Sequence, residues 1–176
     1  MEIYGVKNSV IRCEAFDDYS AIDELHQQAF ERHNEAQLVK NIRNSNYYIP
    51  QLSLVAQIDN RVVGHILFSH INLVGEANLQ VLGLAPLAVL PQFQRHGIGS
   101  ALIRVGLETA DAMGEALVVV LGHPQLYSRF GFKPSVHYQI ESPFPVPENV
   151  FMVKLLKNYQ KNYTGKVVYP PTFQGV

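Results

Sequence analysis

Two glycines one residue apart, Gly97 and Gly99, lie in the sequence QRHGIG, where an apolar run gives way to an amphipathic stretch. The preceding LGLAPLAVLPQF is typical of a strand, and the following SALIRVGLETADAMG has apolar residues at helical spacing. The pair therefore marks a turn from a strand into a helix. Glycine permits positive φ in such a turn, and its missing side chain also lets a ligand approach the backbone.

The same geometry favours an anion at this turn. The first amides of a helix lack intrahelical acceptors, and the helix dipole adds partial positive charge there. A dinucleotide-binding loop would need glycine where this chain has Leu102, and a P-loop would need Lys and then Ser or Thr after its last glycine. The turn is then either a pyrophosphate cradle, to which Arg95 and His96 add charge, or a purely structural strand-to-helix turn.

The rest of the pattern predicts an α/β chain built on one sheet. No linker divides it, so we expect a single domain over 1–176, with 158–176 as a C-terminal extension packed on the body. Gly114 is expected to close the central helix as a C-terminal cap. Strands are expected over 9–16, 52–59, 62–74, 79–90, 115–122, 135–142 and 149–156, and helices over 17–30, 34–44, 97–113 and, as a short helix or turn, 123–132.

Composition excludes several classes of function. A formal net charge of -1 offers no basic field to nucleic acid or to an anionic membrane, so neither is expected as a partner. No apolar run approaches the roughly 18 residues needed to span a bilayer. The single cysteine, Cys13, cannot form an internal disulfide, and the N-terminus carries no signal-peptide pattern, so a cytoplasmic location is expected.

With these elements in place, the chain resembles the GNAT superfamily of acetyl-CoA-dependent N-acetyltransferases. That family's signature is Gln or Arg, two residues, Gly, one residue, then Gly or Ala, and Gln94, Gly97 and Gly99 match it in register. The segments PLAVLPQFQRHGIGSALI and LGHPQLYSRFGF look most like its YhbS-type branch of predicted acetyltransferases. The resemblance implies one N-acetyltransferase domain of the α+β type, with a mixed, mostly antiparallel sheet, helices on both faces, and splayed fourth and fifth strands.

The resemblance also implies acetyl-CoA as co-substrate, without a metal. The pantetheine arm would enter the gap beside the fourth strand at Leu87, Ala88 and Val89, and the Val89 amide would bind the thioester oxygen as it becomes an oxyanion. Pro86 and Pro91 flank this segment, as expected of a strand with a broken ladder or of an edge strand. The pyrophosphate would lie on the backbone of the following loop and helix start, which comprise Gln94, Arg95, His96, Gly97, Ile98, Gly99 and Ser100.

Tyr127 is implied as the general acid, because the family commonly places after the fifth strand a tyrosine that protonates the coenzyme A sulfur. His123 lies where the family often has a polar group facing coenzyme A, and it would equally suit the cap of a short helix. Glu35 is the candidate general base, with Glu31 close by. Both glutamates would equally serve as solvated charges at a helix start.

Two histidines are further candidates for the acceptor side. His65 and His70 are five residues apart on one predicted strand, so strand alternation sends them to opposite faces and at most one can face the cleft. A water chain to backbone carbonyls is the remaining route for the acceptor's proton.

Three functions remain open from the sequence. They are an N-acetyltransferase that acts by direct attack of a primary amine in a ternary complex, a non-catalytic acyl-CoA-binding sensor, and a small phosphate-ligand module. The first is favoured, because a sensor would be expected to lose Tyr127 or the bulge prolines and this chain keeps both. The expected acceptor is a small-molecule amine or a peptide, and a homodimer is compatible with the sequence.

Overall fold

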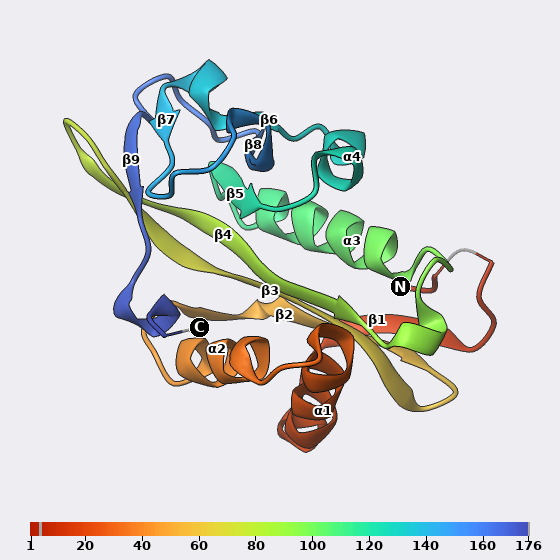
Figure 1. Ribbon diagram of the computed structural model, residues 1–176. Helices are drawn as coiled ribbons and strands as arrows, with labels where there is room; N and C mark the ends of the chain where they lie inside the picture. Colours follow the sequence, from red (N-terminus) through yellow and green to blue (C-terminus); the bar gives the residue numbers. More distant parts are fainter. Residues whose placement is uncertain (4, 176) are drawn as a thin grey trace.

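A computed structural model describes residues 1–3 and 5–175. A twisted sheet runs through the middle of the molecule, as Figure 1 shows, and helices cover both of its faces. Helices α1 (Tyr19–Phe30) and α2 (Asn34–Arg43) lie on one face, and α3 (Ile98–Ala112) lies on the other. Gly114 follows α3 with φ of 85°, so the expected C-terminal cap is confirmed.

The sheet is mixed and mostly antiparallel. In the described chain its main path runs β1, β2, β3, β4, β5, β8, β6, and the β4–β5 pair is parallel. The predicted fold class, with helices on both faces, is confirmed. The strands are β1 (Ser9–Cys13), β2 (Tyr48–Ile58), β3 (Arg61–Val74), β4 (Asn78–Val89), β5 (Leu117–Leu121), β6 (Lys133–Pro134), β7 (Ile140–Glu141), β8 (Phe151–Leu155) and β9 (Gly165–Val168).

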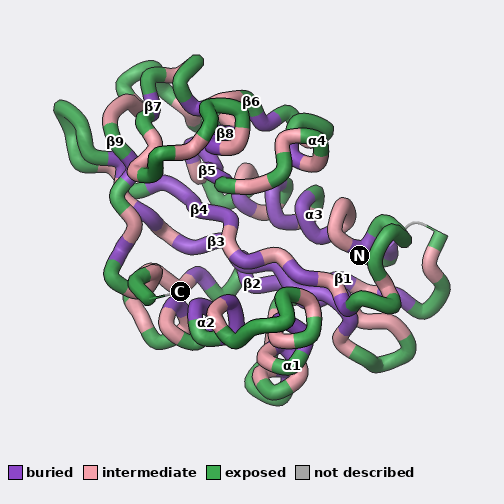
Figure 2. Tube along the Cα trace, in the orientation of Figure 1, coloured by how far each residue is buried: buried purple, intermediate pink, exposed green. Residues whose placement is uncertain are grey.

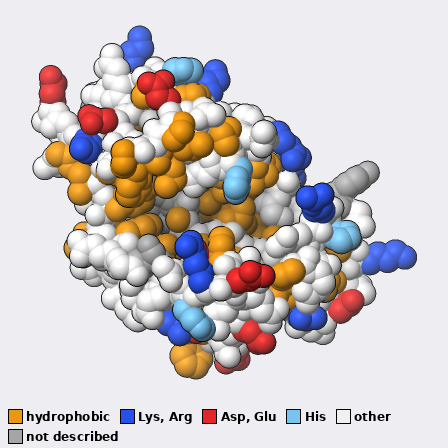
Figure 3. All heavy atoms as spheres, viewed as in Figure 1, with side chains coloured by type: hydrophobic (Ala, Val, Ile, Leu, Met, Phe, Trp, Pro, Cys, Tyr) orange, Lys and Arg blue, Asp and Glu red, His pale blue; other side chains and the backbone are white. Residues whose placement is uncertain are grey.

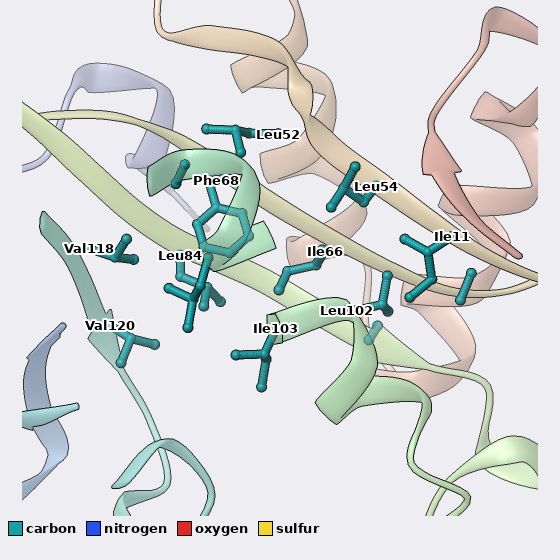
Figure 4. Close-up of a cluster of buried hydrophobic side chains, with 14 of the residues drawn as sticks. Ile11, Leu52, Leu54, Ile66, Phe68, Leu84, Leu102, Ile103, Val118 and Val120 are labelled. Carbon is teal, nitrogen blue, oxygen red and sulfur yellow. The ribbon is translucent and has the colours of Figure 1, made fainter. Parts of the chain in front are cut away.

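Alternating strand residues give the sheet two apolar faces. Figure 2 shows that buried residues follow the central strands and the inward sides of the helices. On one face, Val55 and Leu67 pack with Ile22, Val39 and Ile42 of the α1–α2 layer. On the other face, α3 packs on a cluster, part of which is drawn in Figure 4, that includes Leu52, Leu54, Ile66, Phe68, Leu84, Leu102, Ile103, Val118 and Val120.

Strand β4 is interrupted halfway along its length. The register with β3 shifts so that Leu67 faces two β4 residues, Ala85 and Pro86, which is a β-bulge. Within the described residues, β5 pairs with β4 at Leu82 and Gly83 and nowhere further along, so the two strands separate beyond that point. β4 lies between β3 and β5 in the sheet, and the expected splay is confirmed; Pro86 lies in the bulge beyond the last β5 pair, and Pro91 lies in the 3-10 turn after β4.

The strand predicted over 135–142 is wrong for most of its length. Ser135–Tyr138 is a 3-10 turn, and of these residues only Ile140–Glu141 is extended, in parallel with β9. Gln139 between them has φ of 58°, which turns the chain away from an extended path.

The C-terminal segment joins the sheet and then reaches the helix layer. Strand β9 pairs with the end of β3, where Val167 faces Leu73 and is buried. Figure 1 shows the chain ending beside α2, where Asn41 donates a hydrogen bond to the Thr172 carbonyl at 3.3 Å. This description extends to Gly175, since Val176 lies outside the described residues.

A buried polar network holds α1 and α2 on the sheet. Glu14, just after β1, accepts hydrogen bonds from Arg43 of α2 at 3.0 and 2.9 Å and from the Tyr48 hydroxyl at 2.6 Å. His65 of β3 lies 3.4 Å from the same carboxylate, and its Nδ1 is 2.9 Å from Nε2 of His26 in α1. Burial alone would raise the pKa of Glu14, but its hydrogen bonds outweigh that effect and hold the pKa well below its ordinary value.

We expect this network to make stability depend on pH. Burial lowers the pKa of His26 to about 2 and also lowers that of His65. The unfolded chain therefore takes up protons that the folded chain does not, so stability is full above about pH 6.5 and is lost as the pH falls below it. Between about pH 6.5 and pH 5, the unfolding free energy should fall by roughly 1 kcal/mol per pH unit through His26, and His65 adds a fall in the same direction. Urea unfolding across this range measures the slope.

The matched variants are His26→Gln and His137→Gln, since His137 is exposed. His26→Gln should make the slope shallower by roughly 1 kcal/mol per pH unit, whereas His137→Gln should leave it unchanged. Identical slopes in wild type and His26→Gln would contradict the assignment of a neutral buried His26.

Candidate active site

A cavity of about 790 Å³ opens at the splay between β4 and β5 and extends to the α1–α2 layer. Its volume falls within the range of small-ligand sites. Its walls come from segments far apart in the sequence: the β4 bulge, the segment after β5, the α1–α2 connection and the C-terminal segment. Figure 3 shows hydrophobic side chains gathered around this hollow.

Strand β4 presents its unpaired backbone to the cavity. Leu84–Leu87 line it, whereas Val89 does not. The Leu90 amide donates to the Val63 carbonyl of β3 at 2.8 Å, so strand alternation points the amides of Leu87 and Val89 away from β3 and toward the splay. The Leu87 amide is therefore the one that faces the cavity. Ala88 between them is buried, and it pairs with His65, so its side chain lies on the sheet face that α1 covers.

Tyr127 ends the short helix α4 (Pro124–Tyr127), which follows β5, and it lines the cavity. The ring packs edge-on against Phe132 at 5.5 Å between centroids. Burial raises the pKa of Tyr127 to about 12, so the hydroxyl stays protonated across the physiological range and is available as a donor. The ring also lies against the backbone at Gly122, where an added Cβ would be 2.7 Å from Cε2.

His123 occupies the N-cap position of α4 and lines the same cavity. Its side chain makes no capping hydrogen bond. His123 therefore does not cap α4 through its side chain, and its imidazole is available to a ligand in the cavity.

Glu35 lies in the first turn of α2, faces the cavity and is buried. It accepts hydrogen bonds from Nε of Arg32 at 3.0 and 3.1 Å, and the same guanidinium forms a salt bridge with it. Glu31 ends α1, is exposed and does not contribute to the cavity wall. The structure thus brings one of the two candidate glutamates into the site.

The two strand histidines both lie outside the cavity wall. His65 is buried in the network with Glu14 and His26. His70 is bonded to Glu115 through Nε2 at 2.9 Å. Neither is positioned to take a proton from an acceptor in the cavity.

The N-terminus of α3 presents free amides next to the end of β4. Gly97 is the N-cap, with φ of 82°, and an added Cβ there would meet no atom within 4 Å. A Cβ at Gly99 would meet only Val89 Cγ2, at 3.7 Å, and its φ lies outside the left-handed region, so the fold does not require glycine at this position. In the described chain, no amide from Arg95 to Ser100 donates to a backbone carbonyl. Open space and free donors together fit a pyrophosphate.

The side chains around this turn hold it in place or remain free. Gln94 donates from Nε2 to the Val89 carbonyl at 3.0 Å, so it ties the loop to the end of β4. Ile98 is buried and anchors the first helical turn in the core. Arg95 and His96 are exposed at the turn and can add positive charge beside the free amides.

Several cavity residues were not found from the sequence. Arg32, the aromatic residues Phe30 and Phe144, and Lys166 all line the cavity. Nothing in their local sequence distinguishes them from ordinary loop and helix-end residues. In residues 1–3 and 5–175, no three or more His, Cys, Asp or Glu side chains are grouped to hold a metal ion, and no helix is both long and apolar enough to cross a bilayer.

A splayed parallel strand pair beside a helix N-terminus with free amides defines the acyl-coenzyme A-dependent class of acyltransferases. The family described as Acetyltransferase (GNAT) domain matches residues 11–135. The chain is 38% identical to the N-acetyltransferase YhbS of Escherichia coli K12 over 166 residues, which are 93% of this chain and 98% of that protein. The chain therefore belongs to the GNAT family of acetyltransferases.

Solved structures agree with this assignment. Escherichia coli YhbS in complex with CoA superimposes with a TM-score of 0.86 at 37% identity, covering 94% of this chain and 92% of that one. A GNAT family acetyltransferase from Brucella melitensis, in complex with acetyl-CoA, gives a TM-score of 0.77 at 32% identity, covering 94% and 97%.

The contact between Gly122 and Tyr127 gives a prediction about the site. Gly122→Ala should push the Tyr127 ring out of place and cost about 1–3 kcal/mol of unfolding free energy, because the new Cβ overlaps the ring. Gly99→Ala is the matched control, since its Cβ has room, and it should cost less than about 0.5 kcal/mol. Urea denaturation of both variants checks the difference. Equal stabilities would mean that the ring does not rest on Gly122.

Proposed function

We propose that this protein transfers the acetyl group of acetyl-CoA to a primary amine by direct attack within a ternary complex. The observation that carries this proposal is a single cavity that joins the Leu87 amide and Tyr127 on one wall to Glu35 on another, so both substrates can meet in it. Within its described wall there is no cysteine, serine or threonine, and Cys13 is exposed on β1. Direct attack is therefore better supported than an acyl-enzyme on such a side chain. The free thiol of Cys13 suits a cytoplasmic location.

Acetyl-CoA fits the free backbone of this site. The amides of Arg95–Ser100 would hold the pyrophosphate, with Gln94 bracing the loop, and the arm would follow β4 past Val89 into the splay. We assign the thioester oxygen to the amide of Leu87 instead of Val89, because Leu87 lines the cavity and both amides point the same way. The relatives solved with CoA and with acetyl-CoA support this co-substrate.

The reaction requires two proton movements, and the cavity offers a group for each. As the amine nitrogen bonds to the acetyl carbon, Glu35 would accept the proton that the amine loses. As the carbon–sulfur bond breaks, Tyr127 would donate a hydrogen bond or a proton to the departing sulfur. The Leu87 amide would stabilise the oxyanion between these steps. His123 adds a polar group on the same wall as Tyr127.

The cradle is tested by ligand-dependent stability. Acetyl-CoA should raise the melting temperature of the wild-type protein, because a ligand that binds only the folded state stabilises it. Gly99→Leu should abolish this shift while the protein stays folded, since its side chain would fill the open space over the helix N-terminus. Glu108→Leu is the matched control, because Glu108 is exposed on the same helix away from the turn. A wild-type-sized shift in Gly99→Leu, or an equal shift from adenosine alone, would show that the pyrophosphate is not the main anchor.

Tyr127→Phe tests the acid. Phenylalanine keeps the ring and its packing, so the dissociation constant for acetyl-CoA should be unchanged while turnover falls. The loss should be near the low end of the usual hundredfold to ten-thousandfold range, at about a hundredfold. A donor with a pKa of about 12 has little drive to transfer its proton fully to a thiolate, whose acid is much stronger. Steady-state kinetics with an active amine, beside calorimetric binding of acetyl-CoA, measures both quantities.

Two results are decisive for Tyr127. Equal turnover in both proteins would remove Tyr127 from the chemistry, and a matched loss of affinity and turnover would make it a binding residue only. Acetyl-CoA binding without turnover on any amine, in the wild type, would instead favour the non-catalytic sensor.

A further inference from the structure

Large apolar side chains that remain exposed gather at this cavity. In the described chain there are nine of them, and four, Phe30, Leu121, Phe144 and Val168, line its wall. Phe144 is 42% exposed and Val168 is 43% exposed. Single exposed apolar side chains are normal on a protein surface, whereas a cluster around a cavity marks a surface that a ligand covers.

The wall away from the coenzyme is largely aromatic. The Phe144 and Tyr169 ring centroids lie 5.5 Å apart, and those of Tyr169 and Phe173 lie 4.8 Å apart. Phe30, at the end of α1, lines the same cavity. These side chains come from the loop before β8, the C-terminal segment and the helix layer, so none of them belongs to the strand that would hold the pantetheine arm. Such a wall favours a flat apolar body, which stacks on aromatic rings.

The charges on the wall restrict the acceptor further. Glu35 is the one carboxylate among the described residues that line the cavity, and it is already paired with Arg32. Lys166 adds a second cation. A single ammonium can approach Glu35, but a second positive charge on the same acceptor would lie against apolar or cationic side chains without compensation. Polyamines and lysine-rich peptides therefore fit poorly.

We propose that the acceptor is a monoamine on an apolar, ring-sized body, of the arylalkylamine type. The ammonium would lie at Glu35 and the ring would pack between Phe30 and the aromatic wall of Phe144, Tyr169 and Phe173. A longer acyl chain on coenzyme A would also cover apolar surface, but an acyl chain carries no group that would interact favourably with the buried Glu35 carboxylate in the same cavity. This inference rests on the acetyl transfer proposed above.

A panel of amines tests the acceptor class. With acetyl-CoA, 2-phenylethylamine and tryptamine should exceed ethylamine and spermidine in kcat/KM by at least about tenfold, since the ring adds apolar contacts that the smaller and the more polar amines lack. Release of free coenzyme A thiol measures the rates. Binding of 2-phenylethylamine to the protein loaded with coenzyme A, measured by calorimetry, tests the same point without turnover.

Two phenylalanine variants provide the matched comparison. Phe144→Ala should narrow the preference for 2-phenylethylamine over ethylamine by about tenfold, while the thermal shift with acetyl-CoA stays the same. Phe16 is equally an exposed phenylalanine, at 80% exposure, but it lies outside the cavity wall. Phe16→Ala should leave the preference unchanged.

The outcomes separate this inference from the proposed function. Acetyl transfer that is as fast on ethylamine or faster on spermidine would overturn the acceptor class and leave acetyl transfer standing. If the protein prefers hexanoyl-CoA to acetyl-CoA and Phe144→Ala removes that preference, the aromatic wall binds the acyl chain. This result would also overturn the proposed acceptor class. Acetyl-CoA binding without transfer, together with no binding of 2-phenylethylamine, would overturn both proposals.

Discussion

The separation of β4 from β5 is the constraint on which the rest of the molecule depends. Pro86 has no amide to donate, and the bulge at Ala85 and Pro86 changes the direction of β4 just after its last pair with β5 at Gly83. Backbone groups left without partners inside a sheet are costly unless something else satisfies them. The splay therefore leaves the Leu87 amide in a wall that a ligand can complete. The sheet survives the gap because α3 packs across both strands and β8 continues the sheet beyond β5.

The helix layer across from this gap is held by charge as well as by apolar packing. Glu14 and Arg43 form an almost fully buried ion pair, with side chains 1% and 8% exposed, and such a pair contributes orientation more reliably than net stability. Tyr48 and the bonded pair His26 and His65 complete this polar network. Its hydrogen bonds attach α1 and α2 to the β1, β2 and β3 side of the sheet. This arrangement positions the α1–α2 connection, and with it Glu35, over the open end of the splay.

The sequence allowed the coenzyme side to be predicted much better than the acceptor side. Glycine at 97 and proline at 86 impose local backbone constraints, so the helix start and the broken strand follow from residues near them. The aromatic wall depends instead on Phe144 and Phe173 meeting around Tyr169, a contact set by how β9 joins β3. The strand predicted over 135–142 was wrong for most of its length because the chain turns at Gln139, so only Ile140–Glu141 reach β9.

The burial of Tyr127 links the two sides of the site. The apolar surroundings that raise its pKa to about 12 make it a reliable hydrogen-bond donor but a weakly driven acid. In the proposed reaction, the rate would then depend more on positioning and on the fixed Leu87 amide than on proton transfer to sulfur. Both effects are stronger in a site without water, because a fixed dipole acts more strongly at low dielectric. The rings of Phe30 and Phe144 are exposed, so water still reaches the cavity until an apolar acceptor covers them. Binding of the proposed acceptor would therefore help to exclude water from the site where it reacts.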